Sequence, residues 1–200
     1  MASIQRIVLE ASAPTASADF YTGALGLDSR VSVQPSDEPT TGFRGFVLGL
    51  VVAQPATVDA LVSRASQAGA TVLKPAKKSL WGYGGAVQAP DGTVVTIASS
   101  SKKNTVPASS TIDEIVLQLG VADVVASRDF YADRGFTVAK SYGRKYVEFD
   151  TGPVGLTLNG RSSLAKVAGV SPEGTASHGL VIAGDAGSFT DPDGFVWGAA

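Results

Sequence analysis

Side chains able to do covalent chemistry are scarce in this sequence. Its 200 residues include one histidine, His178, and no cysteine. A nucleophilic triad needs a histidine next to an activated serine, and no Gly-x-Ser-x-Gly elbow is present to supply that serine. The glycine-rich stretch Gly82-Tyr-Gly-Gly85 is not followed by Gly-Lys-Ser or Gly-Lys-Thr, so it does not match a phosphate-binding loop. Residue type alone therefore argues against nucleophilic catalysis and phosphate binding.

Aromatic side chains are the more abundant resource. Trp81, Tyr83, Tyr146 and Trp197 lie in predicted strands or at their ends. Rings on a concave sheet face stack on flat, partly apolar compounds, while a few polar groups fix the orientation of the ligand. We therefore predict a ligand-binding cleft lined by these rings, with Arg6 at its floor to pair with an anionic group.

Three landmarks occur twice, in the same order. Arg6-Ile-Val-Leu-Glu10 recurs as Glu114-Ile-Val-Leu-Gln118, Asp19-Phe-Tyr21 as Asp129-Phe-Tyr131, and Pro90-Asp-Gly92 as Pro192-Asp-Gly194. Between the copies, residues 99–111 are mostly small and polar, as in a linker. The preserved order predicts two related halves, residues 1–98 and 112–200.

Each half is expected to begin with a strand, followed by a helix that carries the Asp-Phe-Tyr. Gly26 is suited to end the first helix, while Asp123 is suited to cap the second and Gly135 to end it. Pro-Asp-Gly is a turn signature, so each copy predicts a turn into a last strand. In the second half only residues 184–187 separate the expected strand at residues 178–183 from the last turn region. This gap leaves no room for another long helix. The pattern predicts an α+β fold of βαβββ-type units with mixed sheets and a shortened second half.

Composition excludes several classes of protein. Hydrophobic residues make up 44% and charged residues 17%, which is typical of a folded globular chain. The formal net charge of −2 offers no basic surface to a nucleic acid. The longest apolar stretch, residues 46–53, is too short to span a bilayer, and the first residues show no signal-peptide pattern. We therefore expect a cytoplasmic protein without a nucleic-acid or membrane partner.

The order of these landmarks resembles the vicinal-oxygen-chelate superfamily. That superfamily includes glyoxalase I, extradiol dioxygenases, fosfomycin-resistance thiol transferases and bleomycin-resistance binding proteins. The likeness is carried by Ala18-Asp-Phe-Tyr-Thr-Gly-Ala-Leu-Gly-Leu27 and Phe189-Thr-Asp-Pro-Asp-Gly-Phe-Val-Trp197, and it extends over both halves. The resemblance implies paired modules with strongly curved sheets. Because one fold of this kind hosts several chemistries, it implies less about function.

Catalytic members of the superfamily hold a divalent metal with His or Glu on the first and last strands of each module. A metal of this kind needs three or four imidazole or carboxylate ligands. Carrying the positions over to this sequence gives Arg6, Glu114, Thr96, Gly198 and His178. Only Glu114 and His178 are ligand types, and a third ligand would have to come from Glu148, Glu173, Asp185 or another chain. The comparison therefore predicts no metal cofactor; the alternative is nickel, zinc, manganese or iron on Glu114 and His178.

Three functions remain open at this point. The first is a metal-independent protein that binds a small molecule, for example by sequestering an aromatic antibiotic or metabolite. The second is a metal-dependent glyoxalase-type lyase or isomerase, or a dioxygenase, that uses Glu114 and His178. The third is a degenerate structural or interaction module. The loss of ligand types at Arg6, Thr96 and Gly198 favours the first. Superfamily members often complete their clefts by pairing, so a homodimer is also expected.

Overall fold

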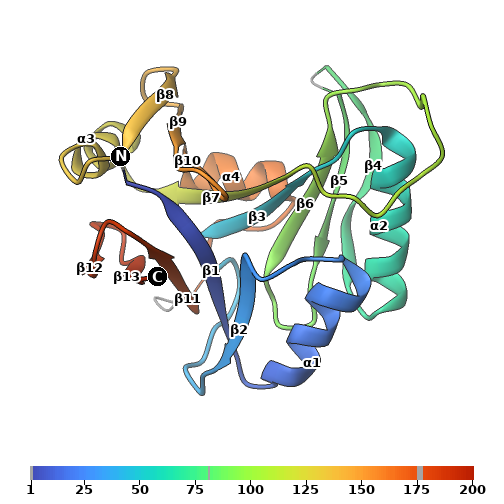
Figure 1. Ribbon diagram of the computed structural model, residues 1–200, viewed down its shortest axis with the longest axis horizontal. Helices are drawn as coiled ribbons and strands as arrows, with labels where there is room; N and C mark the ends of the chain where they lie inside the picture. The colour runs from blue at the N-terminus through green and yellow to red at the C-terminus, as the bar shows by residue number, and fades with distance from the viewer. Residues whose placement is uncertain (1, 81, 175–177) are drawn as a thin grey trace.

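The computed structural model describes residues 2–80, 82–174 and 178–200, which form two mixed sheets with few helices (Figure 1). In chain order the elements are β1 (Ile4–Ala11), α1 (Pro14–Asp19), the π-helical η1 (Phe20–Ala24), β2 (Val31–Pro35), β3 (Phe46–Val51), α2 (Pro55–Gln67), β4 (Thr71–Ser79), β5 (Gly82–Gln88), β6 (Val94–Ser99), β7 (Glu114–Val121), α3 (Val124–Ala132), β8 (Thr137–Ser141), β9 (Tyr146–Asp150), β10 (Gly155–Gly160), α4 (Arg161–Ala168), β11 (Leu180–Gly184), β12 (Phe189–Thr190) and β13 (Val196–Ala199). Among these residues, no helix is both long and apolar enough to cross a membrane.

The eight-stranded sheet contains two complete βαβββ modules. One module is β3-α2-β4-β5-β6 and the other is β7-α3-β8-β9-β10, and the strand order is β4-β5-β6-β3-β7-β10-β9-β8. In each module the first strand is parallel to the last, as the β3–β6 and β7–β10 pairs show. The modules join through antiparallel β3 and β7, with Phe46 opposite Leu119 and Val51 opposite Glu114. The predicted α+β fold of βαβββ-type units is confirmed.

The five-stranded sheet combines the two ends of the chain. Its order is β12-β13-β11-β1-β2, so the first two strands of the protein pair with the last three. Blue β1 and red β11 lie side by side in Figure 1, and their antiparallel register places Ile7 opposite Ile182. Only residues 185–188 connect β11 to β12, which confirms the predicted shortening of the second half. Both sheets therefore take strands from both halves.

The main core lies on one face of each sheet. On β3 the side chains of Phe46, Leu48 and Leu50 are buried in it, and Ile7 and Leu9 of β1 belong to the same cluster. The opposite face of the eight-stranded sheet is open except at one end, where α4 packs across β7, β10, β3 and β6. There Leu164, Ala165 and Ala168 of α4 form a second small core with Phe43, Val47 and Val94. Helix α4 thus covers part of a face that would otherwise be open.

The repeated landmarks fasten neighbouring units to each other. The Tyr21 hydroxyl donates to Asp91 of the first Pro-Asp-Gly turn at 2.8 Å, and the Tyr131 hydroxyl donates to Asp191 beside the second turn at 2.6 Å. Both tyrosines are buried, and burial first, then the nearby carboxylate, raises the pKa of each well above its usual value. The Asp-Phe-Tyr motif therefore holds a helix against the last turn of the adjoining unit.

Local signals at the helix ends behave as predicted. Asp123 accepts hydrogen bonds from the backbone N–H groups of Val125 and Ala126, which makes it the N-cap of α3. Gly26 and Gly135 have φ of 70° and 86°, the left-handed conformation that ends a helix with little strain only at glycine.

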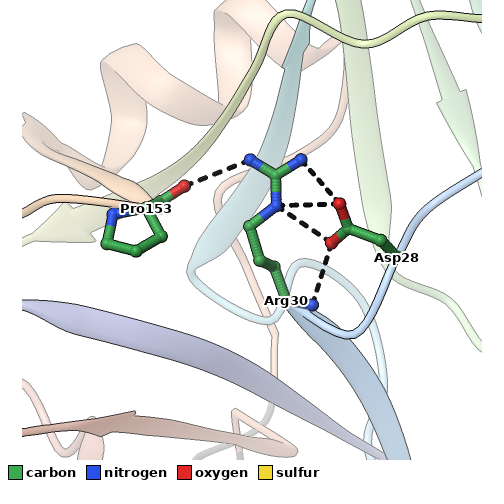
Figure 2. Close-up of polar contacts among 3 residues, drawn as sticks. All are labelled: Asp28, Arg30 and Pro153. Atoms are coloured by element: carbon green, nitrogen blue, oxygen red, sulfur yellow. Dashed lines mark hydrogen bonds and ion pairs between the residues drawn. The ribbon is translucent and has the colours of Figure 1, made fainter.

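Arg30, which forms a surface ion pair with Asp28, also connects the two halves. Figure 2 shows the Arg30 guanidinium donating to both carboxylate oxygens of Asp28, with Nη2 2.9 Å from Oδ2. The remaining nitrogen, Nη1, donates to the Pro153 carbonyl of the second half at 3.3 Å. The hydrogen bonds from Arg30 lower the pKa of Asp28.

Candidate ligand-binding cleft

The open face of the eight-stranded sheet forms a cleft between the two complete modules. Strand alternation places Val47, Gly49 and Val51 of β3 on this face, because Phe46, Leu48 and Leu50 point into the core. Two adjoining hollows, of about 140 and 270 Å³, share Thr96 and Ala98 of β6. Both modules belong to one chain, so strands of a single chain line the cleft.

A band of uncharged polar side chains crosses the cleft floor from β10 to β6. Thr157 of β10 lies beside Gln118 of β7 in the parallel register, and the Gln118 Nε2 donates to Thr96 Oγ1 at 3.3 Å. The Asn159 Nδ2 donates to Thr157 Oγ1, also at 3.3 Å. Val116, Val51 and Ala98 provide apolar surface beside this band.

Gly49 makes the Gln118–Thr96 bond possible. Strand β3 lies between β7 and β6, so the Gln118 side chain must pass over it to reach Thr96. A Cβ on Gly49 would lie only 2.7 Å from the Gln118 Nε2. Glycine at this position therefore lets the amide lie flat across the middle of the floor.

One end of the cleft is aromatic and acidic. The half-buried Tyr146 donates its hydroxyl to Glu148 at 3.0 Å, and Glu148 forms an ion pair with Lys140 at 3.2 Å. Burial, followed by the hydrogen bond to Glu148 and the charges of Glu148 and Glu114, raises the pKa of Tyr146. The phenol therefore stays protonated at neutral pH and presents an aromatic ring to the cleft.

The opposite end is closed by α4. Lys74 of β4 donates its Nζ to the carbonyls of Lys166 and Val167 at 2.7 Å each, which satisfies two acceptors in the last turn of α4. Val167 itself is exposed and lines the larger hollow. This tie holds α4 against β4 and limits the size of the cleft at that end.

Two of the larger hollows outside the cleft are less suited to hold a ligand. One, of about 390 Å³, is lined by the loop with Asp37 and Glu38, by Glu10 and by the first Pro-Asp-Gly turn. The other, of about 770 Å³, is a shallow open surface beside His178 and the second turn. Both are built mainly from loops, whereas side chains on five paired strands line the smaller hollow of the cleft. Sites on strands hold their side chains more precisely, so we place the candidate site in the cleft.

The residues that the sequence predicted for the cleft do not all lie there in the structure. Tyr146 lies in the cleft. Tyr83 contributes to its lining, but its hydroxyl donates to Asp59 of α2 at 2.7 Å, on the opposite face of the sheet. Trp197 is 2% exposed, packs against Tyr131 and donates its indole N–H to the Tyr131 hydroxyl. The expectation that Trp197 lines a cleft was wrong, because its face of β13 belongs to the core.

Of the remaining two predicted residues, Arg6 does not contribute a side chain to this cleft. Arg6 is exposed on β1 of the five-stranded sheet, opposite Ala183, and is not part of the cleft floor. Trp81 lies outside the described residues.

Glu114 and His178 are not brought together. Glu114 pairs with Val51 at the far end of β3, whereas His178 contacts Arg44, which directly precedes β3. The His178 Nδ1 is 2.5 Å from the Arg44 carbonyl oxygen and its Nε2 is 3.0 Å from the Asp193 carbonyl oxygen, so both nitrogens are engaged. The two residues therefore do not share a metal site, and the alternative built on them is not supported.

The other positions considered for a metal also lack the necessary arrangement. Thr96 lies in the cleft, Gly198 lies on β13 of the other sheet, and Asp185 accepts hydrogen bonds from Ser3. Within residues 2–80, 82–174 and 178–200, no three His, Asp or Glu side chains converge as a metal site would require. The donor set of the described chain does not fit a divalent cation.

Sequence reasoning missed the polar floor and a buried arginine. Gln118 of β7 and Thr157 of β10 are polar residues flanked by buried leucines, and that alternation was a usable signal. Arg44, 3% exposed, donates its Nε to the His178 carbonyl at 2.7 Å and its Nη1 to Thr93 Oγ1 at 3.1 Å. Nothing in the local sequence marks Arg44, because its acceptors come from distant turns and strands.

Comparison with known structures identifies the architecture. Glyoxalase I from Zea mays matches 98% of this chain and 91% of its own, with a TM-score of 0.62 and 15% identity. A putative dioxygenase from Bacillus subtilis matches 98% of this chain and 83% of its own, with a TM-score of 0.60 and 12% identity. Neither a protein-family model nor a curated protein sequence matches the chain.

These matches extend over nearly the whole chain. At such low sequence identities they show that the fold is similar and nothing more. They agree with the paired βαβββ modules and with the landmarks that resembled the superfamily. The chain therefore has a glyoxalase-like fold.

Proposed function

We propose that the protein binds a small, partly aromatic molecule in the cleft of the eight-stranded sheet, without a metal. The observation that carries this proposal is the cleft floor itself, where the side chains of Thr96, Gln118 and Thr157 offer hydrogen bonds but no carboxylate or imidazole. Apolar walls and the Tyr146 ring supply the surface on which a flat ligand stacks.

The expected affinity for a small probe is modest. Burying about 150 Å² of apolar surface, the scale of one aromatic ring, contributes about 4 kcal/mol. That free energy corresponds to a dissociation constant of about 1 mM, before any hydrogen bonds are counted. The two hollows are at or below the lower end of the usual size of ligand sites, which also points to a compact ligand. A method that detects weak binding is therefore required.

Nuclear magnetic resonance with the full chain tests the proposal. A set of neutral, cationic and anionic aromatic fragments is titrated into labelled protein, and the backbone signals of Val116, Thr96 and Ala98 report on the cleft. Ala98→Trp fills the shared part of the two hollows and is expected to abolish the shifts. Val106→Trp is the matched control, because Val106 is 60% exposed in the segment between the halves and does not line the cleft.

Elemental analysis of the purified protein, before and after incubation with nickel, zinc, manganese and iron(II), tests metal independence. We expect no stoichiometric metal and the same fragment binding in the presence of a chelator. About one retained metal per chain, lost in His178→Ala, would support the lyase or dioxygenase alternative instead. Absence of any fragment binding in the cleft would favour a structural or interaction module.

A further inference from the structure

The polar band of the cleft has hydrogen-bonding groups that the protein itself does not use. Thr96 Oγ1 and Thr157 Oγ1 each accept an amide N–H, from Gln118 and Asn159. A hydroxyl also has one O–H to donate, and no hydrogen bond among the described residues uses either one. Thr157 is only 6% exposed, so little water reaches it. Both hydroxyls are therefore available as donors to a ligand.

Gln118 provides the complementary acceptor. Its Nε2 is directed to Thr96, and across the described chain no donor reaches its Oε1. Thr157 is its register partner on β10, so a hydroxyl donor lies to either side of the Gln118 carboxamide. The floor thus presents an acceptor flanked by donors, the arrangement that matches a ligand edge with a carbonyl next to an N–H.

Charge at the cleft argues against an anionic ligand. Glu148 and Glu114 lie at the Tyr146 end, and only Glu148 has an ion-pair partner within the described residues, Lys140. At the other end, the Lys74 ammonium is occupied by the carbonyls of α4, which leaves the exposed Lys77 on β4 as the nearby cation. A carboxylate or phosphate would meet no buried cation on the floor, so an uncharged polar group is preferred.

From these observations we propose that the cleft selects uncharged, planar compounds with an amide edge, such as aromatic lactams. In this arrangement the ligand N–H donates to Gln118 Oε1 and its carbonyl accepts from the Thr157 or Thr96 hydroxyl, while the ring packs between Val116, Ala98 and Tyr146 on either side of the floor. The inference rests on the proposed function, because it assigns a ligand class to the same cleft.

A matched set of probes tests this selectivity with the wild-type protein. 2-Quinolinone has the amide edge, 1-methyl-2-quinolinone has the same ring without the N–H donor, and 2-naphthoate carries a negative charge. We expect 2-quinolinone to shift the cleft signals and to bind at least ten times more tightly than either of the others. Equal or tighter binding of the methylated or anionic probe would overturn the proposal without requiring any variant to fold.

Variants then assign the contacts. Thr157→Val keeps the shape of the side chain without its hydroxyl, and Gln118→Leu removes the acceptor. Each is expected to weaken 2-quinolinone binding about tenfold and to leave 1-methyl-2-quinolinone binding nearly unchanged, whereas Gln67→Leu on the exposed side of α2 changes neither. Unchanged 2-quinolinone binding in both cleft variants would contradict the proposal.

The two proposals fail in different ways. If other fragments shift the cleft signals and the lactam does not, the ligand class is wrong but the binding function stands. If no fragment of any charge shifts these signals, both are wrong.

Discussion

Replacing the buried Arg44 with methionine should destabilise the junction of the two halves. Arg44 is 3% exposed and donates to the carbonyls of His178, Gly179 and Glu10 and to the Thr93 hydroxyl. No ion pair joins it to a carboxylate within the described chain, so its charge is stabilised by carbonyl dipoles. Burial lowers the pKa of Arg44, and the charges of Asp91, Tyr21 and Glu10 partly oppose that effect.

The magnitude follows from the groups left without a partner. Arg44→Met leaves two buried acceptors without this donor, the His178 carbonyl and the Thr93 hydroxyl oxygen, whereas the Gly179 carbonyl still accepts from the Glu10 N–H. Each unsatisfied group costs about 1–3 kcal/mol. Removing the guanidinium also removes its own desolvation cost of several kcal/mol, which offsets part of the loss. We expect a net loss of about 2 kcal/mol, equivalent to a Tm lower by about 4–8 °C for a chain of this size.

Urea unfolding followed by tryptophan fluorescence and circular dichroism measures this loss. Arg6→Met is the matched control, because Arg6 is exposed on β1 and should change stability by less than about 0.5 kcal/mol. Arg44→Lys should recover only part of the stability, since an ammonium group lacks the planar fork that reaches several acceptors. A loss below about 1 kcal/mol in Arg44→Met, with the m-value unchanged, would refute this account of the junction.

Three further predictions concern individual contacts. The pKa of Tyr131 is raised by burial, so Tyr131 stays protonated in the folded protein while the unfolded chain loses the proton above about pH 10. Stability should therefore fall as pH rises, and Tyr131→Phe should reduce that slope by about 1 kcal/mol per pH unit in urea titrations between pH 10 and 11. Gly49→Ala should displace the Gln118 amide, which is the end of a flexible side chain, and lower the free energy of unfolding by at most about 1 kcal/mol. It should also shift the nuclear magnetic resonance signals of the Gln118 side-chain amide and weaken fragment binding. Unchanged amide signals would contradict the proposed clash. The pKa of Asp28 is lowered by Arg30, so the pair contributes above about pH 4 and loses its contribution below it. Because the pair is largely exposed, Asp28→Asn should cost at most about 1 kcal/mol at pH 7, and its urea midpoint should approach that of the wild type at pH 3.

Features that depend on neighbouring residues were predictable from the sequence. The Asp123 cap, the glycines that end two helices and the two Pro-Asp-Gly turns all follow from local backbone preferences. The repeated landmarks were also readable, since each one recurs in a short stretch of chain. What the sequence did not reveal is that Tyr21 and Tyr131 use their hydroxyls to bind those turns. A tyrosine on an apolar helix face is predicted to be a core residue. The partner of its hydroxyl lies 60 to 70 residues away along the chain, so the local sequence does not indicate it.

The candidate site was the least predictable part, for the same physical reason. Large aromatic side chains were expected in the cleft, but Trp197 is more stable in the core, where it packs against other rings and its indole N–H has a partner. The cleft floor is made instead of smaller groups, Thr96, Gln118 and Thr157, whose significance depends on which strands are adjacent.

By itself, then, the sequence determined the α+β class, the repeated units, the caps and turns, and the scarcity of residues suited to metal or nucleophilic chemistry. Only the tertiary structure decided that β1 pairs with β11 and β3 with β7, so that the two halves share both sheets. Strand pairing is a long-range choice, set by the burial of whole faces and not by local preference. The same choice separates Glu114 from His178 and brings Gln118 to Thr96 across Gly49, and it thereby determines what the cleft can bind.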